Sequence, residues 1–231
     1  MKSLFIVGNW KSNKGIAEAH DWLRQFNAKC QMPNAKWKDL AIVLCVPYTL
    51  LNFLHDQIKQ LNLPIVLGAQ DVSPFGDGAY TGAVSARQVK EFADWVIIGH
   101  SERRKYFGET DEVLAQKVAQ AKTAGLNIIY CVSDENTVIP DGVDAVAYEP
   151  VWAIGTGKAE TPEHANAVIA GVKAKTQIRS VIYGGSVTPD NVASFLAQPA
   201  IDGVLPGGAS LDAGIFAALI LASQGQALQT L

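Results

Sequence analysis

The sequence has little of what marks several large classes of protein. Its 231 residues contain three cysteines, an odd number without paired spacing, which argues against a disulfide framework and suits a reducing cytoplasm, where we expect the protein. The net charge is -3 and the one basic cluster is ERRK at 102–105, so we expect no nucleic-acid partner. The apolar run before Gly8 is too short for a signal peptide, and no later run could cross a membrane.

Motifs that indicate a metal or a cofactor are missing too. No HExxH occurs, and the histidines at positions 20, 55, 100 and 164 lack the spacing of metal ligands. The GTGK stretch at 155–158 lacks the spacing of a P-loop, and no GxGxxG opens a helix. We therefore expect an activity that needs neither a metal nor a cofactor.

Eight short apolar runs, rich in β-branched residues, alternate with helical patterns along the chain. Each run is apolar on both faces, as expected of parallel strands buried between two layers. No linker or change of composition divides the sequence, so we expect one domain over residues 1–231. Eight strand–helix repeats at this length favour a single closed (β/α)8 barrel over an open sheet. The runs are residues 4–9, 41–46, 65–70, 95–100, 127–132, 144–149, 180–185 and 202–207.

The interval between the fifth and sixth apolar runs is too short to hold a full helix. Only ten residues, 133–142, lie between Val132 at the end of the fifth run and Val143 just before the sixth, and Pro140 stands near their end. A crossover usually needs about a dozen residues and a helix, so we predict that this helix is missing or reduced to a turn. Its absence would partly bare the outer faces of both strands, and Val138 and Ile139 should fold back over them. The other helices are expected near 15–28, 48–61, 85–94, 111–124, 189–198 and 211–223, with one more beginning at Pro162.

Polar residues and glycines stand where the predicted strands end, which is the working face of such a barrel. Taken singly, each has a plainer interpretation: a surface lysine, a loop histidine, a structural ion pair or a tight turn. Together, a carboxylate, an imidazole and a lysine around glycine-rich loops suit proton abstraction next to a carbonyl, with the phosphate of the substrate as anchor. The residues are Asn9, Lys11, His100, Glu149, Gly184-Gly185-Ser186 and Gly207-Gly208.

Five motifs, spread from the first strand to the last helix, resemble the triosephosphate isomerase family. The resemblance implies a TIM barrel that interconverts dihydroxyacetone phosphate and D-glyceraldehyde 3-phosphate without a cofactor. It implies Glu149 as the base and His100 as a neutral electrophile, which is the known assignment in this enzyme. The motifs are NWK at 9–11, GHSERR at 99–104, YEPVWAIGTGK at 148–158, YGGS at 183–186 and GGASL at 207–211.

The resemblance also assigns supporting roles around this pair. Lys11 and Asn9 would stabilise the oxyanion, and Glu102 would support the site. Residues 153–157 would be the tip of a lid that closes over the base and excludes water. Backbone amides would hold the phosphate of the substrate, and by resemblance they belong to Gly155, Ser186, Gly207 and Gly208.

A homodimer is implied as well, through the loop 71–84, with Thr81 reaching toward the partner's active site. Two departures from the family pattern predict a weak dimer: Ala83 replaces a glutamate that usually meets Arg103 of the partner subunit, and Ser12 replaces a larger residue. Two further departures are Pro206, where valine is usual, and Ser133-Asp134, where Gly-Glu is usual.

Two other functions are compatible with a phosphate-binding barrel. An aldolase would need a Schiff-base lysine inside a strand, and none of the eight runs contains one. A catalytically weak or inactive barrel could be kept as a phosphate-ligand-binding or scaffold protein. Loss of Glu149, His100 or Lys11 would favour that alternative, and all three are present.

Overall fold

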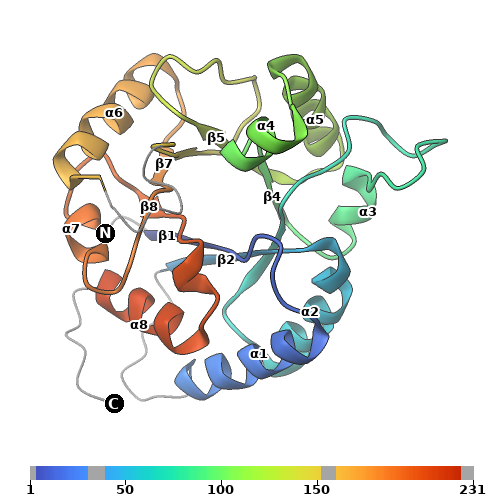
Figure 1. Ribbon diagram of the computed structural model, residues 1–231, viewed down its shortest axis with the longest axis horizontal. Helices are drawn as coiled ribbons and strands as arrows, with labels where there is room; N and C mark the ends of the chain where they lie inside the picture. Colours follow the sequence, from blue (N-terminus) through green and yellow to red (C-terminus); the bar gives the residue numbers. More distant parts are fainter. Residues whose placement is uncertain (1–3, 31–39, 152–159, 225–231) are drawn as a thin grey trace.

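The computed structural model describes residues 4–30, 40–151 and 160–224. Eight parallel strands close into a barrel in sequence order, and helices form an outer ring (Figure 1). The predicted (β/α)8 fold is confirmed. The strands are β1 (Leu4–Asn9), β2 (Leu40–Val46), β3 (Val66–Ala69), β4 (Trp95–Ile98), β5 (Asn127–Val132), β6 (Ala145–Tyr148), β7 (Ser180–Tyr183) and β8 (Gly203–Val204). The helices are α1 (Ile16–Cys30), α2 (Tyr48–Leu61), α3 (Ala86–Lys90), α4 (Ser101–Phe107), α5 (Asp111–Thr123), α6 (Pro162–Lys175), α7 (Val192–Leu196), the 3-10 turn η1 (Gly208–Ser210) and α8 (Ala213–Ser223).

The strands are buried on both faces, as their composition predicts. Along β1, Phe5 and Val7 pack with Val43 in a small cluster inside the barrel, whereas Ile6 joins the larger cluster between barrel and helices. The alternation follows from the two-residue repeat of a strand. The barrel closes where Phe5 pairs with Gly203. That the whole of residues 1–231 forms one domain stays a prediction.

Helix ends follow the local capping signals. The hydroxyl of Thr110 accepts a hydrogen bond from the amide of Val113 at the start of α5, and Gly125 follows that helix with φ +75°. Thr161 caps α6 in the same way, directly before Pro162. These helix ends were predictable because each cap depends on two or three adjacent residues.

The strand β4 is shorter than predicted, and a helix that the sequence did not indicate follows it. The run 95–100 ends as a strand at Ile98, because Gly99 takes a left-handed φ of +77° and His100 caps α4. Similarly, β8 ends at Val204, close to Pro206, which has no N–H to continue the ladder. Both endings expose polar groups at the carboxyl end of the barrel.

No helix joins β5 to β6, as predicted, and the ring of helices is open between α5 and α6 (Figure 1). The expectation that the strands would be partly bare is wrong, because their outward side chains are buried. Ile139 and Val143 pack against the core cluster to which these side chains belong, but Val138 is exposed, contrary to the prediction that it would fold back. The buried side chains are Ile128, Tyr130, Val146 and Tyr148.

Candidate active site

The carboxyl ends of the strands bring the predicted residues to one face. Asn9 ends β1, His100 follows β4, and Glu149 follows β6; all three side chains are buried. Lys11 lies two residues beyond β1, and Ser186 and Gly207 follow β7 and β8. Residues from five different repeats therefore meet, although they are widely spaced in sequence.

The carboxylate of Glu149 is held on one side and open on the other. Its Oε2 accepts a hydrogen bond of 2.9 Å from the amide of Ser101, at the first turn of α4. Its Oε1 lies 3.0 Å from Nε2 of His100, but not with hydrogen-bond geometry, so this oxygen has no donor among the described residues. Burial first, and then the carboxylate of Glu149, raise the pKa of the neighbouring Cys131 thiol. Cys131 is therefore a buried, protonated thiol, as expected of a core residue.

The imidazole of His100 has a defined tautomer. Its Nδ1 accepts a hydrogen bond of 3.2 Å from the amide of Glu102, which is the cap of α4. An accepting Nδ1 carries no proton, so the proton of the neutral ring is on Nε2, which faces Glu149. The start of the helix thus fixes both the orientation and the donor side of the ring.

Lys11 has an unusual backbone conformation and a short ion pair. Its φ is +53°, which is uncommon for a residue with a side chain, and its amide donates to Oδ1 of Asn9 at 2.9 Å. Its ammonium lies 2.5 Å from Oε1 of Glu102. Strained backbone of this kind gathers at functional sites, where the surroundings hold it in place.

Gln70 is a residue of this site that the sequence analysis missed. Its amide nitrogen lies 3.3 Å from Oδ1 of Asn9, 3.0 Å from the carbonyl of Lys11 and 3.1 Å from that of Cys45. Because all three partners are acceptors, the carbonyl end of the Asn9 amide faces Gln70 and its NH2 group points away. Gln70 ends the third apolar run, so the strand-end rule applied to the other residues would have found it. Ser101, whose amide holds the carboxylate of Glu149, was also missed.

A cavity of about 440 Å³ lies over the ends of β7 and β8. Lys11 and His100 line one side of it, and the other side is formed by glycine-rich backbone. A Cβ atom at Gly207 would lie 3.2 Å from Cε of Lys11, so any larger residue there would press on the lysine side chain. The lining residues include Gly184, Gly185, Ser186, Gly207 and Gly208. The remaining predicted amide, that of Gly155, and the predicted lid tip lie outside the described residues.

The loop 71–84 projects from the barrel between β3 and α3 (Figure 1). Its base is closed by a hydrogen bond of 2.8 Å from the amide of Ser73 to the carbonyl of Val84, and Thr81 near its tip is exposed. Arg103 pairs within its own chain, at 2.9 Å from Asp71 and 2.7 Å from Glu109. The guanidinium therefore has two carboxylate partners in a single chain.

Among the described residues, no three His, Cys, Asp or Glu side chains are grouped so that they could hold a metal ion. In the same part of the chain, no helix is both long enough and apolar enough to span a membrane.

Comparison with known proteins identifies the family. The family model of triosephosphate isomerase matches residues 4–223. The triosephosphate isomerase of Herminiimonas arsenicoxydans is 41% identical, over 96% of this chain and 100% of its own, and that of Vibrio cholerae is 38% identical over 96% and 98%. The crystal structure of triosephosphate isomerase from Bartonella henselae has a TM-score of 0.80 and 32% identity, covering 96% of this chain and 99% of that one. The chain belongs to the triosephosphate isomerase family.

Proposed function

We propose that the protein isomerises its substrate through an enediolate, with Glu149 as the base. Membership of the family makes the protein an isomerase of dihydroxyacetone phosphate and D-glyceraldehyde 3-phosphate, a reaction of glycolysis and gluconeogenesis. The assignment of Glu149 is supported by one observation above all: its buried carboxylate has an open oxygen beside the donor nitrogen of His100. A base and a proton donor so close together can act on adjacent atoms of one substrate.

The proton moves between two neighbouring carbons of the substrate. Oε1 of Glu149 takes the proton from one carbon, and the resulting enediolate accepts it back on the other. Ser101 holds the other carboxylate oxygen, so the amide must be released, or must follow, if the carboxylate shifts toward the substrate.

The developing negative charge falls on the substrate oxygens, where three groups converge. The Nε2–H of His100 donates from a neutral ring, as this family of enzymes is known to do. The ammonium of Lys11 supplies positive charge, and Glu102 positions it. The NH2 group of Asn9 is the third donor, because Gln70 and the Lys11 amide occupy its carbonyl end.

The phosphate of the substrate anchors it in the cavity over β7 and β8. Backbone amides of Ser186, Gly207 and Gly208 would bind its oxygens, together with Gly155. Lys11 lines the same cavity, so its charge serves both the phosphate and the enediolate. Pro206 has no N–H of its own, but it precedes the amides proposed to bind the phosphate, so none of those donors is lost. Its carbonyl accepts a hydrogen bond of 3.0 Å from the amide of Asn9.

We further propose a homodimer and a cytoplasmic location. A cavity of about 450 Å³ lies beside Lys11 and Ser12, where the loop 71–84 of a second copy would fit with Thr81 at its tip. Because Arg103 is paired within its chain, it needs no carboxylate from a partner. Three free cysteines, Cys30, Cys45 and Cys131, suit a reducing compartment.

A coupled assay tests the assignment of the base. Dihydroxyacetone phosphate formed from D-glyceraldehyde 3-phosphate is reduced by glycerol-3-phosphate dehydrogenase, and the loss of NADH absorbance gives turnover. Glu149→Gln should lower kcat by about 10²–10⁴, the usual contribution of general-base catalysis, with an unchanged circular-dichroism spectrum. Near-normal kcat in this variant would remove Glu149 from the role. A wild-type protein without turnover would instead favour the scaffold alternative.

A further inference from the structure

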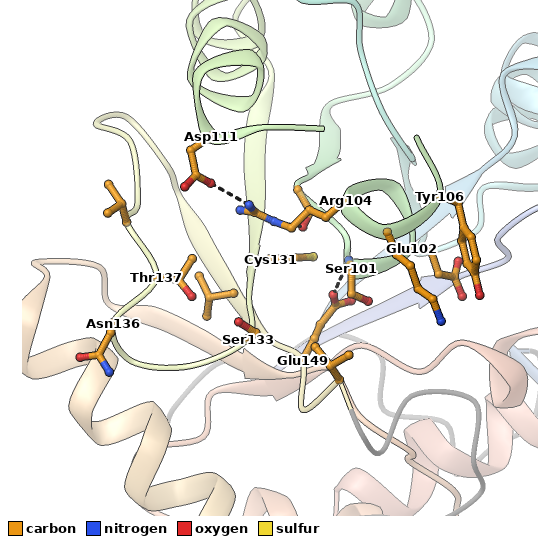
Figure 2. A pocket seen from close by; sticks show the side chains of 15 residues that line it. Ser101, Glu102, Arg104, Tyr106, Asp111, Cys131, Ser133, Asn136, Thr137 and Glu149 are labelled. Atoms are coloured by element: carbon orange, nitrogen blue, oxygen red, sulfur yellow. Dashed lines mark hydrogen bonds and ion pairs between the residues drawn. The ribbon is translucent and has the colours of Figure 1, made fainter. Parts of the chain in front are cut away.

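A second cavity, of about 860 Å³, has Glu149 in its lining (Figure 2). It is formed by the α4 segment, the end of β5 and the loop that replaces a helix between β5 and β6. None of its lining residues lines the phosphate cavity. The two cavities therefore share no lining residue, although Ser101, Glu102 and Glu149 of the candidate active site line the second one.

The second cavity exists because the fifth repeat has a loop where the others have a helix. Asn136, Thr137 and Val138 of this loop line it, and Figure 2 shows the first two beside Ser133. Three large apolar side chains of its lining are exposed: Tyr106 by 68%, Val138 by 72% and Val151 by 56%. Exposed apolar surface is costly in water, so an apolar occupant would gain free energy by covering these three side chains.

Most charged groups of the lining have partners, except that Oε1 of Glu149 has no donor among the described residues. The ammonium of Lys105 lies 5.0 Å from the centroid of the Tyr106 ring. The guanidinium of Arg104 lies 2.7 Å from Asp111, and it also donates to the carbonyl of Gly99 and the hydroxyl of Tyr130 (Figure 2). Glu102 is paired with Lys11. A charged ligand would have to break such pairs or remain unpaired next to them, which is unfavourable. A neutral ligand meets neither cost.

Two hydroxyl groups are available to orient a neutral ligand. The hydroxyls of Ser133 and Thr137 each lie 3.4 Å from the carboxylate of Asp134, which is long for an O–H···O hydrogen bond. Either can turn to donate to a ligand carbonyl at little cost. The volume lies within the range of about 300–1,000 Å³ that small-molecule sites occupy.

We propose that this cavity binds a neutral, mainly apolar organic molecule that carries a carbonyl or hydroxyl group. The molecule lies against Tyr106, Val138 and Val151, and its polar group accepts from Ser133 or Thr137. Binding is measured without turnover, so the test is independent of the residue roles proposed for the isomerisation.

The test uses Prodan, an uncharged naphthalene ketone whose emission shifts to the blue when it leaves water. Titration of the full chain should give saturable binding of one Prodan per chain. Ser133→Trp, which fills the cavity, should weaken this binding at least about tenfold, a factor that corresponds to 1.4 kcal/mol. Val138→Glu, which charges its exposed rim, should weaken it as well. Ile215→Trp is the matched control, because it places the same side chain in the phosphate cavity.

Circular dichroism shows whether each variant is folded. If Ser133→Trp does not fold, the test rests on Val138→Glu. The proposal is overturned if Prodan shows no saturable binding. It is equally overturned if the folded cavity variants bind as tightly as wild type, or if Ile215→Trp alone abolishes binding, since Prodan would then occupy the phosphate cavity.

Discussion

Replacing Lys117 by methionine tests whether a buried charge cluster holds one side of the barrel together. The ammonium of Lys117 is buried and lies 2.6 Å from Oδ1 of Asp71 and 2.5 Å from Oε1 of Glu109. Arg103 is the other cation of the cluster and contacts the same two carboxylates. Oε2 of Glu109 already lacks a hydrogen-bond donor among the described residues. Without Lys117, two buried carboxylates must share one guanidinium.

The expected loss of unfolding free energy follows from these contacts. Removing one partner of a buried ion pair typically costs about 3–5 kcal/mol, and the remaining Arg103 places this case near 3 kcal/mol. Most natural domains have about 5–15 kcal/mol of stability, so the variant should fold but with little reserve.

The loss should also depend on pH. Burial raises the pKa of Asp71 above its usual 3.8, while Lys117 and then Arg103 act against that rise. Removing Lys117 therefore raises this pKa further in the folded state. A carboxyl group with a raised folded pKa stabilises the fold below its unfolded pKa, and this contribution is lost as pH rises through the folded value. The difference between variant and wild type should therefore be largest at neutral pH and shrink toward pH 4.

Urea unfolding followed by circular dichroism, at equal protein concentrations, gives both measurements. Lys173→Met is the matched control: its ammonium pairs with Asp202 at 2.5 Å, but the side chain is 25% exposed, so the loss should be about 1 kcal/mol. Adding Asp71→Asn to Lys117→Met should restore about 1–2 kcal/mol, because Arg103 then has a single carboxylate to pair with. A loss below about 1 kcal/mol at pH 7, or no recovery in the double variant, would refute the reasoning.

Three further predictions concern activity and assembly. Lys11→Ala should raise KM and lower kcat together, because the ammonium serves both phosphate and enediolate; an unchanged KM would contradict the phosphate contact. Gly184→Ala should lower kcat about tenfold in a folded protein, because its Cβ would lie 3.0 Å from Cγ of Glu149 and displace the base; normal kcat would count against that displacement. Because Ala83 and Ser12 are smaller than the residues usual in the family, the proposed dimer interface has fewer contacts, and activity per chain should fall on dilution as the dimer dissociates. Sedimentation that shows a tight dimer at nanomolar chain concentration would disprove this.

The strands could be predicted from the sequence, but their ends could not. Burial on both faces produces apolar runs that stand out in one pass, and all eight became strands. The end of β4 depends on the left-handed backbone at Gly99 and on the capping role of His100, neither of which changes the apolar pattern. Helix α4 was missed because it has no buried residue, and so no apolar stripe to detect.

The site could be predicted as a set of strand ends, but not as a set of contacts. Asn9, His100 and Glu149 are found by asking which polar groups follow buried runs. Gln70 also ends an apolar run, but its hydrogen bonds go to residues 25 to 61 positions away in the sequence, and no local pattern indicates such partners. The cover over β5 and β6 was misjudged for a similar reason, because the path of a loop without periodicity is set by what it packs against.

The short connection between β5 and β6 also bears on how the barrel assembles. Residues 133–144 link these two strands, whereas residues 10–39 link β1 to β2. Since the entropy of closing a loop grows with the logarithm of its length, the shorter link costs about 0.8 kcal/mol less to close. The pairing of β5 with β6 thus has a lower entropic barrier than that of β1 with β2. In a refolding experiment, amides of Ala147 and Tyr148 should then gain protection from exchange before those of Leu44 and Cys45, and the strand that precedes Glu149, the proposed base, would form early.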